Sequence, residues 1–233
     1  MPKIVWLKAK RLWRRQIRPI AITILLLTSF RSAIADWNDV PTGSMKPSIL
    51  EGDRILVNKL AYGLKIPFTT WHLAQWSAPQ RGEIVVFPSP ADGLRLVKRV
   101  VGLPGDTVLM MDNRLFINGQ PIHYGSLDTN TIHELTPFEQ PTHDYASEQL
   151  GTMNHPVMST PAIIGARRSF GPITIPAGEY FMMGDNRDNS NDSRFIGTVK
   201  LEKIVGRSSY VAMSLDYEHH YMPRWERFFK ALP

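Results

Sequence analysis

Short apolar runs punctuated by Gly, Pro and Asn dominate the chain after Asp36, and this pattern is typical of a β protein. Strands are predicted where β-branched and aromatic residues cluster, at 54–58, 83–87, 94–101, 107–111, 114–117 and 179–183. We therefore expect a mostly β fold in which antiparallel sheets form a compact core.

One hairpin is indicated by the sequence with particular clarity. Asn118 and Gly119 separate two apolar runs, and both residue types tolerate the positive φ angles of a type I′ turn. We predict a two-residue hairpin at this point.

Two later regions depart from the strand pattern. Between 123 and 171 the alternation fades and Pro, Thr, His and Asn become frequent, which favours a loop-rich insertion subdomain. At 223–232 the spacing of Trp225, Phe228, Phe229 and Leu232 predicts a short amphipathic helix packed against a sheet edge.

The N-terminal region has a different composition. Residues 1–18 carry seven basic side chains and no acid, and residues 19–30 are uncharged and mostly aliphatic. The apolar segment, extended to Ala35, predicts one membrane helix that leaves the arm inside the cell and the body outside. A cleavable signal peptide is the alternative, because Ala33, Ile34 and Ala35 form a small-x-small site at which the segment would be removed. Either interpretation exports the rest of the chain.

These patterns predict four parts of the chain. They are a basic cytoplasmic arm at 1–18, a transmembrane anchor at 19–35, a β core at 36–122 and 172–233, and the insertion subdomain at 123–171.

Charge and cysteine content exclude several classes of function. The arm accounts for the formal charge of +6, because the remaining chain holds 20 basic side chains (27 − 7) against 21 acidic ones. The body thus lacks the basic excess of a nucleic-acid-binding domain, and we expect no nucleic-acid partner. The chain has no cysteine, which excludes disulfides, thiolate metal ligands and a cysteine nucleophile.

Ser44 is a candidate nucleophile. It lies in a turn bounded by Gly43 and Pro47, where a hydroxyl is expected to be exposed. The Ser44 amide and the Thr42 hydroxyl are placed to donate hydrogen bonds to a developing oxyanion. The alternatives are an ordinary turn serine and a threonine hydroxyl bonded to the local backbone.

Lys98 is a candidate general base. Period-two alternation puts it on the same face as Leu94, Leu96 and Val100, where burial lowers the pKa of the amine toward the range in which it accepts a proton. Its neighbour Arg99 is expected on the opposite face, in solvent. Ser44 and Lys98 would then form a serine–lysine dyad. The alternative is a lysine that reaches solvent or pairs with a carboxylate.

The segment 184–194 is dense in Asp, Asn and Ser. It lacks the glycine and the terminal glutamate of an EF-hand loop and contains two arginines, so we expect no metal ion. A rigid turn is favoured, in which Asp192 pairs with Arg194 and Ser190 is held toward a buried amine.

Four segments in this order, 42–47, 81–87, 98–106 and 184–194, resemble the successive conserved boxes of bacterial type I signal peptidases. The resemblance runs from about residue 31 to residue 206. It implies that Ser44 is the acylating nucleophile and Lys98 the general base, with Thr42 as an oxyanion donor beside the Ser44 amide. Position 42 is often serine in this family, and threonine keeps the hydroxyl but restricts its rotamers.

The same resemblance implies supporting roles around the dyad. Ser190 would orient the lysine, Asp192 and Arg194 would support the geometry of the site, and Met45 would line the substrate pocket.

The resemblance also implies a function. The protein is expected to be a single-pass enzyme of the bacterial inner membrane, with a catalytic β core on the outer (periplasmic) face and a variable second domain. Its substrates would be exported preproteins, cut after a small-x-small motif through an acyl-enzyme. Membrane lipid is an expected partner, and no cofactor or metal is expected. A dedicated processing peptidase of the same family, for example for pilins, is an alternative, as is a non-enzymatic exported β module that binds a partner.

Overall fold

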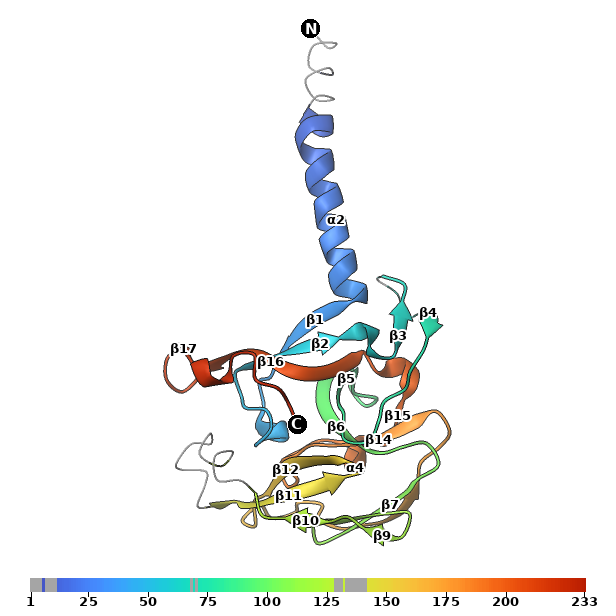
Figure 1. Ribbon diagram of the computed structural model, residues 1–233, viewed down its shortest axis with the longest axis vertical. Coiled ribbons are helices and arrows are strands. Elements are labelled where there is room, and N and C mark those ends of the chain that lie inside the picture. Colours follow the sequence, from blue (N-terminus) through green and yellow to red (C-terminus); the bar gives the residue numbers. More distant parts are fainter. Residues whose placement is uncertain (1–5, 7–11, 68, 70, 128–131, 133–141) are drawn as a thin grey trace.

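A helical stalk leads into a β body in the computed structural model (Figure 1), which describes residues 6, 12–67, 69, 71–127, 132 and 142–233. The stalk consists of the π-helical turn η1 (Trp13–Ile17) followed by α2 (Arg18–Ala33). The segment predicted as an anchor is thus helical up to Ala33, and its isoleucine and leucine side chains between Ile20 and Leu27 are exposed. Within the described part of the chain, no helix combines the length and the apolar character needed to cross a membrane.

An eight-stranded antiparallel sheet forms the centre of the body. Its order is β1-β2-β16-β5-β6-β14-β15, with β17 paired to β16. The strands are β1 (Ala35–Asp39), β2 (Asp53–Asn58), β5 (Ile84–Pro88), β6 (Arg95–Gly102), β14 (Glu179–Met183), β15 (Val199–Lys200), β16 (Gly206–Asp216) and β17 (Met222–Pro223).

Three smaller antiparallel sheets complete the body. One has the order β13-β7-β8-β9, one β10-β11-β12, and one pairs β3 with β4. Their strands are β3 (Gly63–Lys65), β4 (His72–Gln75), β7 (Thr107–Met111), β8 (Arg114–Ile117), β9 (Gln120–Pro121), β10 (Tyr124–Gly125), β11 (Asp144–Leu150), β12 (Met153–Ser159) and β13 (Phe170–Thr174). All six strands predicted from the sequence are present, so the mostly β, antiparallel class is confirmed.

The predicted hairpin is also confirmed. Asn118 and Gly119 have φ angles of 53° and 76°, and Ile117 pairs with Gln120 across the turn. The Asn118 side chain fixes the turn further, because its Oδ1 accepts from the Thr107 amide and its Nδ2 donates to Asp106.

Short helical turns connect the remaining strands. They are η2 (Gly43–Met45), η3 (Lys59–Ala61), α4 (Ser193–Ile196), η5 (Leu201–Lys203) and η6 (Trp225–Arg227).

The core contains several separate apolar clusters of buried residues. One cluster joins β6 and β14 to the β7–β8 hairpin through Val101, Met110, Leu115 and Phe181. Another lies below η2 and includes Met45, Ile49 and Val97. Each of these clusters packs directly against strands that carry site residues.

The predicted insertion contains ordered β structure. The described part of 123–171 holds β10, β11 and β12, and an isolated parallel bridge joins Met158 to Asn186. This region therefore packs against the loop that follows β14.

The C-terminal tail differs from its prediction. Only Trp225–Arg227 is helical, as one 3₁₀ turn, and Trp225 and Phe229 are exposed. After this turn the chain runs beside β16, where Ala231 bridges to Tyr210 and the Leu232 amide donates to the Ser209 carbonyl. The predicted amphipathic helix was wrong because the free edge of β16 offers the tail backbone hydrogen bonds.

Candidate active site

The turn that carries Ser44 follows β1 directly. Three residues, Gly43–Met45, form η2, and Thr42 stands at its N-terminal cap in an extended conformation. The Thr42 hydroxyl makes no capping hydrogen bond with this turn, and its side chain is exposed. Ser44 is partly exposed, whereas Met45 is 1% exposed and packs in the apolar cluster beneath.

Lys98 reaches this turn from the central sheet. It lies in β6 opposite Val85 of β5. Its Nζ donates a 2.6 Å hydrogen bond to Ser44 Oγ and a 3.0 Å hydrogen bond to the Val97 carbonyl. The structure thus brings together the two residues that the sequence paired as nucleophile and base.

Burial controls the chemistry of this amine. Lys98 is 2% exposed, and desolvation lowers its pKa from 10.5 to about 8. The carboxylates of Asp192 and Asp185 act in the opposite direction, and the Arg194 guanidinium adds to the lowering. The expected direction of the shift is confirmed, and a large fraction of the amine is neutral at mildly alkaline pH.

The sequence analysis predicted that the Arg99 side chain lies in solvent, and this prediction was wrong. The residue is fully buried, and its guanidinium pairs with Asp185 through Nε to Oδ1 at 2.9 Å and Nη2 to Oδ2 at 2.7 Å. The prediction failed because every residue of β6 from Val97 to Gly102 is buried, so both faces of this strand are covered. Arg99 also donates to the carbonyls of Gly82 and Pro233 and to the Ser48 hydroxyl.

The loop after β14 holds the nucleophile turn. The Asn186 amide donates to the Ser44 carbonyl at 3.1 Å, and Asn186 Nδ2 donates to the Gly43 carbonyl at 3.1 Å. Ser48, four residues after Ser44, donates to Asp185. These contacts were not predicted from the sequence. The many Asp and Asn residues of the loop were the one feature that could have indicated hydrogen bonds to a neighbouring turn.

Gly184 allows the close approach of this loop. A Cβ atom at this position would lie 2.4 Å from the Ser44 carbonyl oxygen and 2.3 Å from Ser190 Oγ. Any side chain would thus push the loop away from the nucleophile turn.

Asp192 and Arg194 pair as the sequence predicted. Arg194 Nε donates to Oδ1 at 2.8 Å and Nη2 donates to Oδ2 at 2.9 Å, with both residues buried. Burial alone would raise the pKa of Asp192, but the hydrogen bond and charge of Arg194 outweigh it and the pKa is lowered. Asp192 also accepts from the Gly184 amide at 3.0 Å, which ties the pair to the start of the loop.

Ser190 is buried against Gly184, and its hydroxyl interacts with the Asp192 carboxylate, whose pKa it helps to lower. Its predicted role in orienting Lys98 therefore stays a prediction. The same holds for Met45, whose side chain lies in the core below Ser44.

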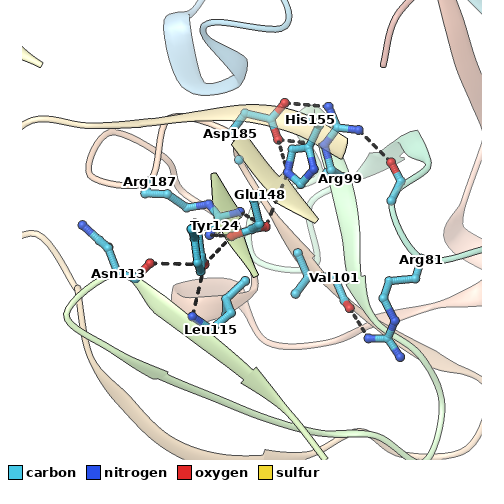
Figure 2. Close-up of polar contacts among 12 residues, drawn as sticks. Arg81, Arg99, Val101, Asn113, Leu115, Tyr124, Glu148, His155, Asp185 and Arg187 are labelled. Atoms are coloured by element: carbon cyan, nitrogen blue, oxygen red, sulfur yellow. Dashed lines mark hydrogen bonds and ion pairs between the residues drawn. The ribbon is translucent and has the colours of Figure 1, made fainter. Parts of the chain in front are cut away.

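A third buried ion pair extends this network toward β11 and β12 (Figure 2). Arg187 donates to both oxygens of Glu148, at 2.8 and 2.6 Å, and Tyr124 donates to the same carboxylate. His155 Nε2 lies 3.4 Å from Glu148 and 3.7 Å from Asp185. Burial and then the charges of Arg99 and Arg187 hold the pKa of His155 well below its usual value, so the imidazole is neutral.

The geometry defines a class of site. A serine hydroxyl in hydrogen-bond contact with a desolvated amine is the arrangement of serine peptidases that use lysine in place of histidine. Among the described residues, no group of three His, Asp or Glu side chains is arranged to hold a metal ion.

Comparison with known proteins agrees with this class. A family model described as signal peptidase, peptidase S26, matches residues 13–213. Signal peptidase I of Pseudomonas fluorescens is 39% identical over 210 residues, which cover 84% of this chain and 70% of that protein. Signal peptidase I of Pseudomonas aeruginosa is 38% identical over 213 residues with the same coverage of each chain. The chain belongs to the signal peptidase family, peptidase S26, and is a serine endopeptidase.

A solved structure was also compared. A signal peptidase I from Enterococcus faecalis is 34% identical, and the match covers 56% of this chain and 97% of that one. The TM-score is 0.35, so the comparison of coordinates adds nothing to the family assignment. Signal peptidases I are membrane-associated enzymes of signal peptide processing, and the homologues support that activity for this chain.

Proposed function

We propose that this chain removes N-terminal signal peptides from exported preproteins through a Ser44–Lys98 dyad and an acyl-enzyme. The observation that carries the proposal is the 2.6 Å contact between Lys98 Nζ and Ser44 Oγ. The amine of this contact is almost fully buried and has a pKa of about 8, which suits a general base.

The reaction begins when neutral Lys98 accepts the Ser44 proton and the oxygen attacks the scissile carbonyl carbon. Collapse of the tetrahedral intermediate breaks the C–N bond, and the Lys98 ammonium gives its proton to the leaving amine of the mature protein. Lys98 then takes a proton from water, and hydroxide attacks the ester carbonyl. Collapse of this second intermediate breaks the ester bond, the Ser44 oxygen takes the proton back from the Lys98 ammonium, and the products are the signal peptide carboxylate and free Ser44.

Thr42 is proposed to stabilise the oxyanion together with the Ser44 amide. Its side chain is exposed beside the turn and makes no cap hydrogen bond there, which supports a hydroxyl that is available to a substrate. Met45, which follows Ser44 and packs in the apolar core, is proposed to line the pocket that accepts small residues before the scissile bond.

The supporting loop is proposed to preorganise the site. Asn186 donates to the carbonyls of Gly43 and Ser44, and the Asp192–Arg194 pair fixes the loop from the other end. Ser190, which lies beside Gly184 in the same loop, is proposed to belong to this supporting group of residues. The geometry of the dyad then depends on the loop as much as on the turn itself.

We infer that the stalk of η1 and α2 holds the body at the outer face of the inner membrane. The exposed aliphatic side chains of α2 and the basic residues of 1–18 support this topology. In spheroplasts, external protease should degrade the β body, and alkaline carbonate should leave the chain in the membrane fraction. Release into the soluble fraction would refute the tether.

The dyad is tested with the full chain in detergent and a purified preprotein. Ser44→Ala and Lys98→Ala should each abolish cleavage, and Lys98→Arg should fail equally because a guanidinium is no base at working pH. Matched controls are Ser89→Ala, a buried serine at the end of β5, and Lys65→Ala, whose amine pKa is also lowered by burial. Both controls should cleave normally.

Cleavage retained in either dyad variant overturns the mechanism. The covalent step has its own test, because an acylating active-site probe should add its mass to Ser44 and to no residue of Ser44→Ala. A panel of preproteins separates a general enzyme from one dedicated to a single substrate.

A further inference from the structure

The β10–β12 sheet pairs with the loop that holds the nucleophile turn. Met158 of β12 forms a parallel bridge with Asn186, and its amide donates to the Asp185 carbonyl at 2.9 Å. Its carbonyl accepts from the Arg187 amide at 2.8 Å. Residues 185–187 are therefore held against β12 in the manner of a short strand, in which neighbouring side chains point to opposite sides.

Asn186 and Arg187 use the two sides of this segment. Asn186 faces the nucleophile turn, where its amide donates to the Ser44 carbonyl and its Nδ2 to the Gly43 carbonyl, both at 3.1 Å. Arg187 reaches β11 and donates to both carboxylate oxygens of Glu148, at 2.8 and 2.6 Å. Because the two residues are adjacent in the chain, a shift of Arg187 also shifts the hydrogen bonds that Asn186 makes with the turn.

The position of Arg187 depends on one carboxylate. The side chain of Arg187 is 2% exposed and that of Glu148 is fully buried. Among the described residues, Arg187 Nε has no hydrogen-bond partner, so Glu148 accepts both hydrogen bonds of the guanidinium. Burial acts to lower the pKa of Arg187, but Glu148 outweighs it and the pKa is raised. A bidentate pair fixes direction as well as distance, so the place of Glu148 sets the place of Arg187.

Glu148 is itself fixed by its neighbours in the small sheet (Figure 2). The Tyr124 hydroxyl of β10 donates to its carboxylate at 2.5 Å and accepts from the Leu115 amide at 3.2 Å. His155 is the cross-strand partner of Glu148 in β12, and its ring lies between Glu148 and Asp185, at 3.4 and 3.7 Å. The carboxylate is therefore held from β10, β11 and β12 together.

We propose that Glu148 is a positioning residue for cleavage, which acts through Arg187 to hold Asn186 against the turn that carries Ser44. The β10–β12 sheet, which lies in the predicted insertion, would then take part in setting the geometry of the dyad. The inference rests on the proposed function, because cleavage is the activity that Glu148 would support. Glu148 is buried behind the loop and is assigned no contact with the substrate.

The first test is Glu148→Gln in the full chain, in detergent with a purified preprotein. This variant keeps the size of the side chain and an oxygen for the Tyr124 hydroxyl, but it replaces the carboxylate that pairs with Arg187. We expect kcat to fall about tenfold and KM to change by no more than about twofold, because a displaced nucleophile slows the chemical step without removing contacts to the substrate. Counting active sites with an acylating probe removes the contribution of unfolded enzyme from kcat.

Glu83→Gln is the matched control. The Glu83 carboxylate also accepts from a tyrosine, Tyr62, and from an arginine, Arg207, each at 2.7 Å. These hydrogen bonds lie beside β5 and β16 and do not involve the nucleophile turn. We expect the control to keep the kcat of the parent enzyme per active site.

A double-mutant cycle with Asn186→Ala tests the route by which Glu148 acts. If Glu148 acts through Asn186, Glu148→Gln should lower kcat by less than about threefold in the Asn186→Ala background, against about tenfold in the parent. Independent effects would instead multiply to about 100-fold in the double variant.

A paired substitution separates position from stability. Glu148→Gln leaves Arg187 buried without a charged partner, so this variant should unfold at a lower urea concentration than the parent. Adding Arg187→Met removes the unpaired charge and should recover the resistance to urea. Its kcat should stay about tenfold low, because the bidentate anchor of the loop is still missing. This double variant carries the test if Glu148→Gln alone does not fold.

Three results would overturn the proposal. The kcat of the parent in folded Glu148→Gln would show that the anchor is not needed. The kcat of the parent in the variant that combines Glu148→Gln with Arg187→Met would show that the ion pair serves stability alone. Full multiplication of the Asn186→Ala and Glu148→Gln effects would show that Glu148 does not act through Asn186. Parent enzyme that does not cut the preprotein refutes the proposed function instead, and the inference falls with it.

Discussion

The buried amine of Lys98 should control how cleavage depends on pH. With a pKa of about 8, roughly 1% of the amine is neutral at pH 6 and about half at pH 8. If neutral Lys98 is the base, kcat/KM should rise about tenfold from pH 6 to 7 and about fiftyfold from pH 6 to 8. Above pH 9 the rate should level off.

The assay follows initial rates of preprotein cleavage at limiting substrate from pH 6 to 10, at constant ionic strength. The Lys65→Ala control should keep the same alkaline limb. Titration of the Lys98 amine in Ser44→Ala by NMR of labelled lysine gives the pKa without turnover. A flat profile, or a limb centred near 10.5, would refute a desolvated lysine base.

The same shift has a stability consequence with a defined sign. Lowering the pKa from 10.5 to about 8 disfavours the charged form in the fold by about 3 kcal/mol. Between these two pH values the unfolded chain binds more protons, so the free energy of unfolding rises with pH. Lys98→Met should therefore stabilise the protein by about 1–3 kcal/mol at pH 7 and lose this advantage by pH 10.5. Urea unfolding at both pH values measures it, and a less stable Met variant at pH 7 contradicts the argument.

Three further changes probe the groups around the dyad. Thr42→Val should lower kcat about 100-fold with KM nearly unchanged. A variant with the same kcat as the parent enzyme would show that Thr42 does not stabilise the oxyanion. Asn186→Ala should lower kcat about tenfold in steady-state assays because it frees the Gly43 carbonyl, and Asn186→Gln should not restore it, since the longer amide cannot keep the same bond. Asp192→Ala should cost about 3–5 kcal/mol in urea unfolding because Arg194 is left buried and unpaired, and adding Arg194→Met should recover part of the loss.

Local features of the fold could be predicted because their causes are local. The strand prediction at 179–183 coincides with β14, and the turn at Asn118 and Gly119 has the expected positive φ angles. The longest strand, β16, was missed. Register shifts interrupt its pairing with β2, so its burial does not alternate and its sequence gives no period-two signal.

The ion pairs of the candidate site could be predicted only where both residues lie close together in the sequence of one loop. Asp192 and Arg194 are two residues apart, and their pairing was anticipated. Arg99 and Asp185 are 86 residues apart, and no local sequence pattern indicates that a buried carboxylate pairs with this arginine. A buried guanidinium is stable only with such a partner, which is why Arg99 was expected in solvent.

The desolvation that lowers the pKa of Lys98 also explains the ion pairs that surround it. A small body that excludes water from one amine excludes it from the neighbouring arginines, and Arg99, Arg187 and Arg194 each meet a carboxylate through two hydrogen bonds. These pairs and the dyad lysine should respond to substitution in opposite ways. Removing a carboxylate should leave a buried charge and destabilise the fold, whereas removing Lys98 should relieve one and give a more stable protein that no longer cleaves. The sign of the change in unfolding free energy therefore separates residues that act on the substrate from residues that hold them in place.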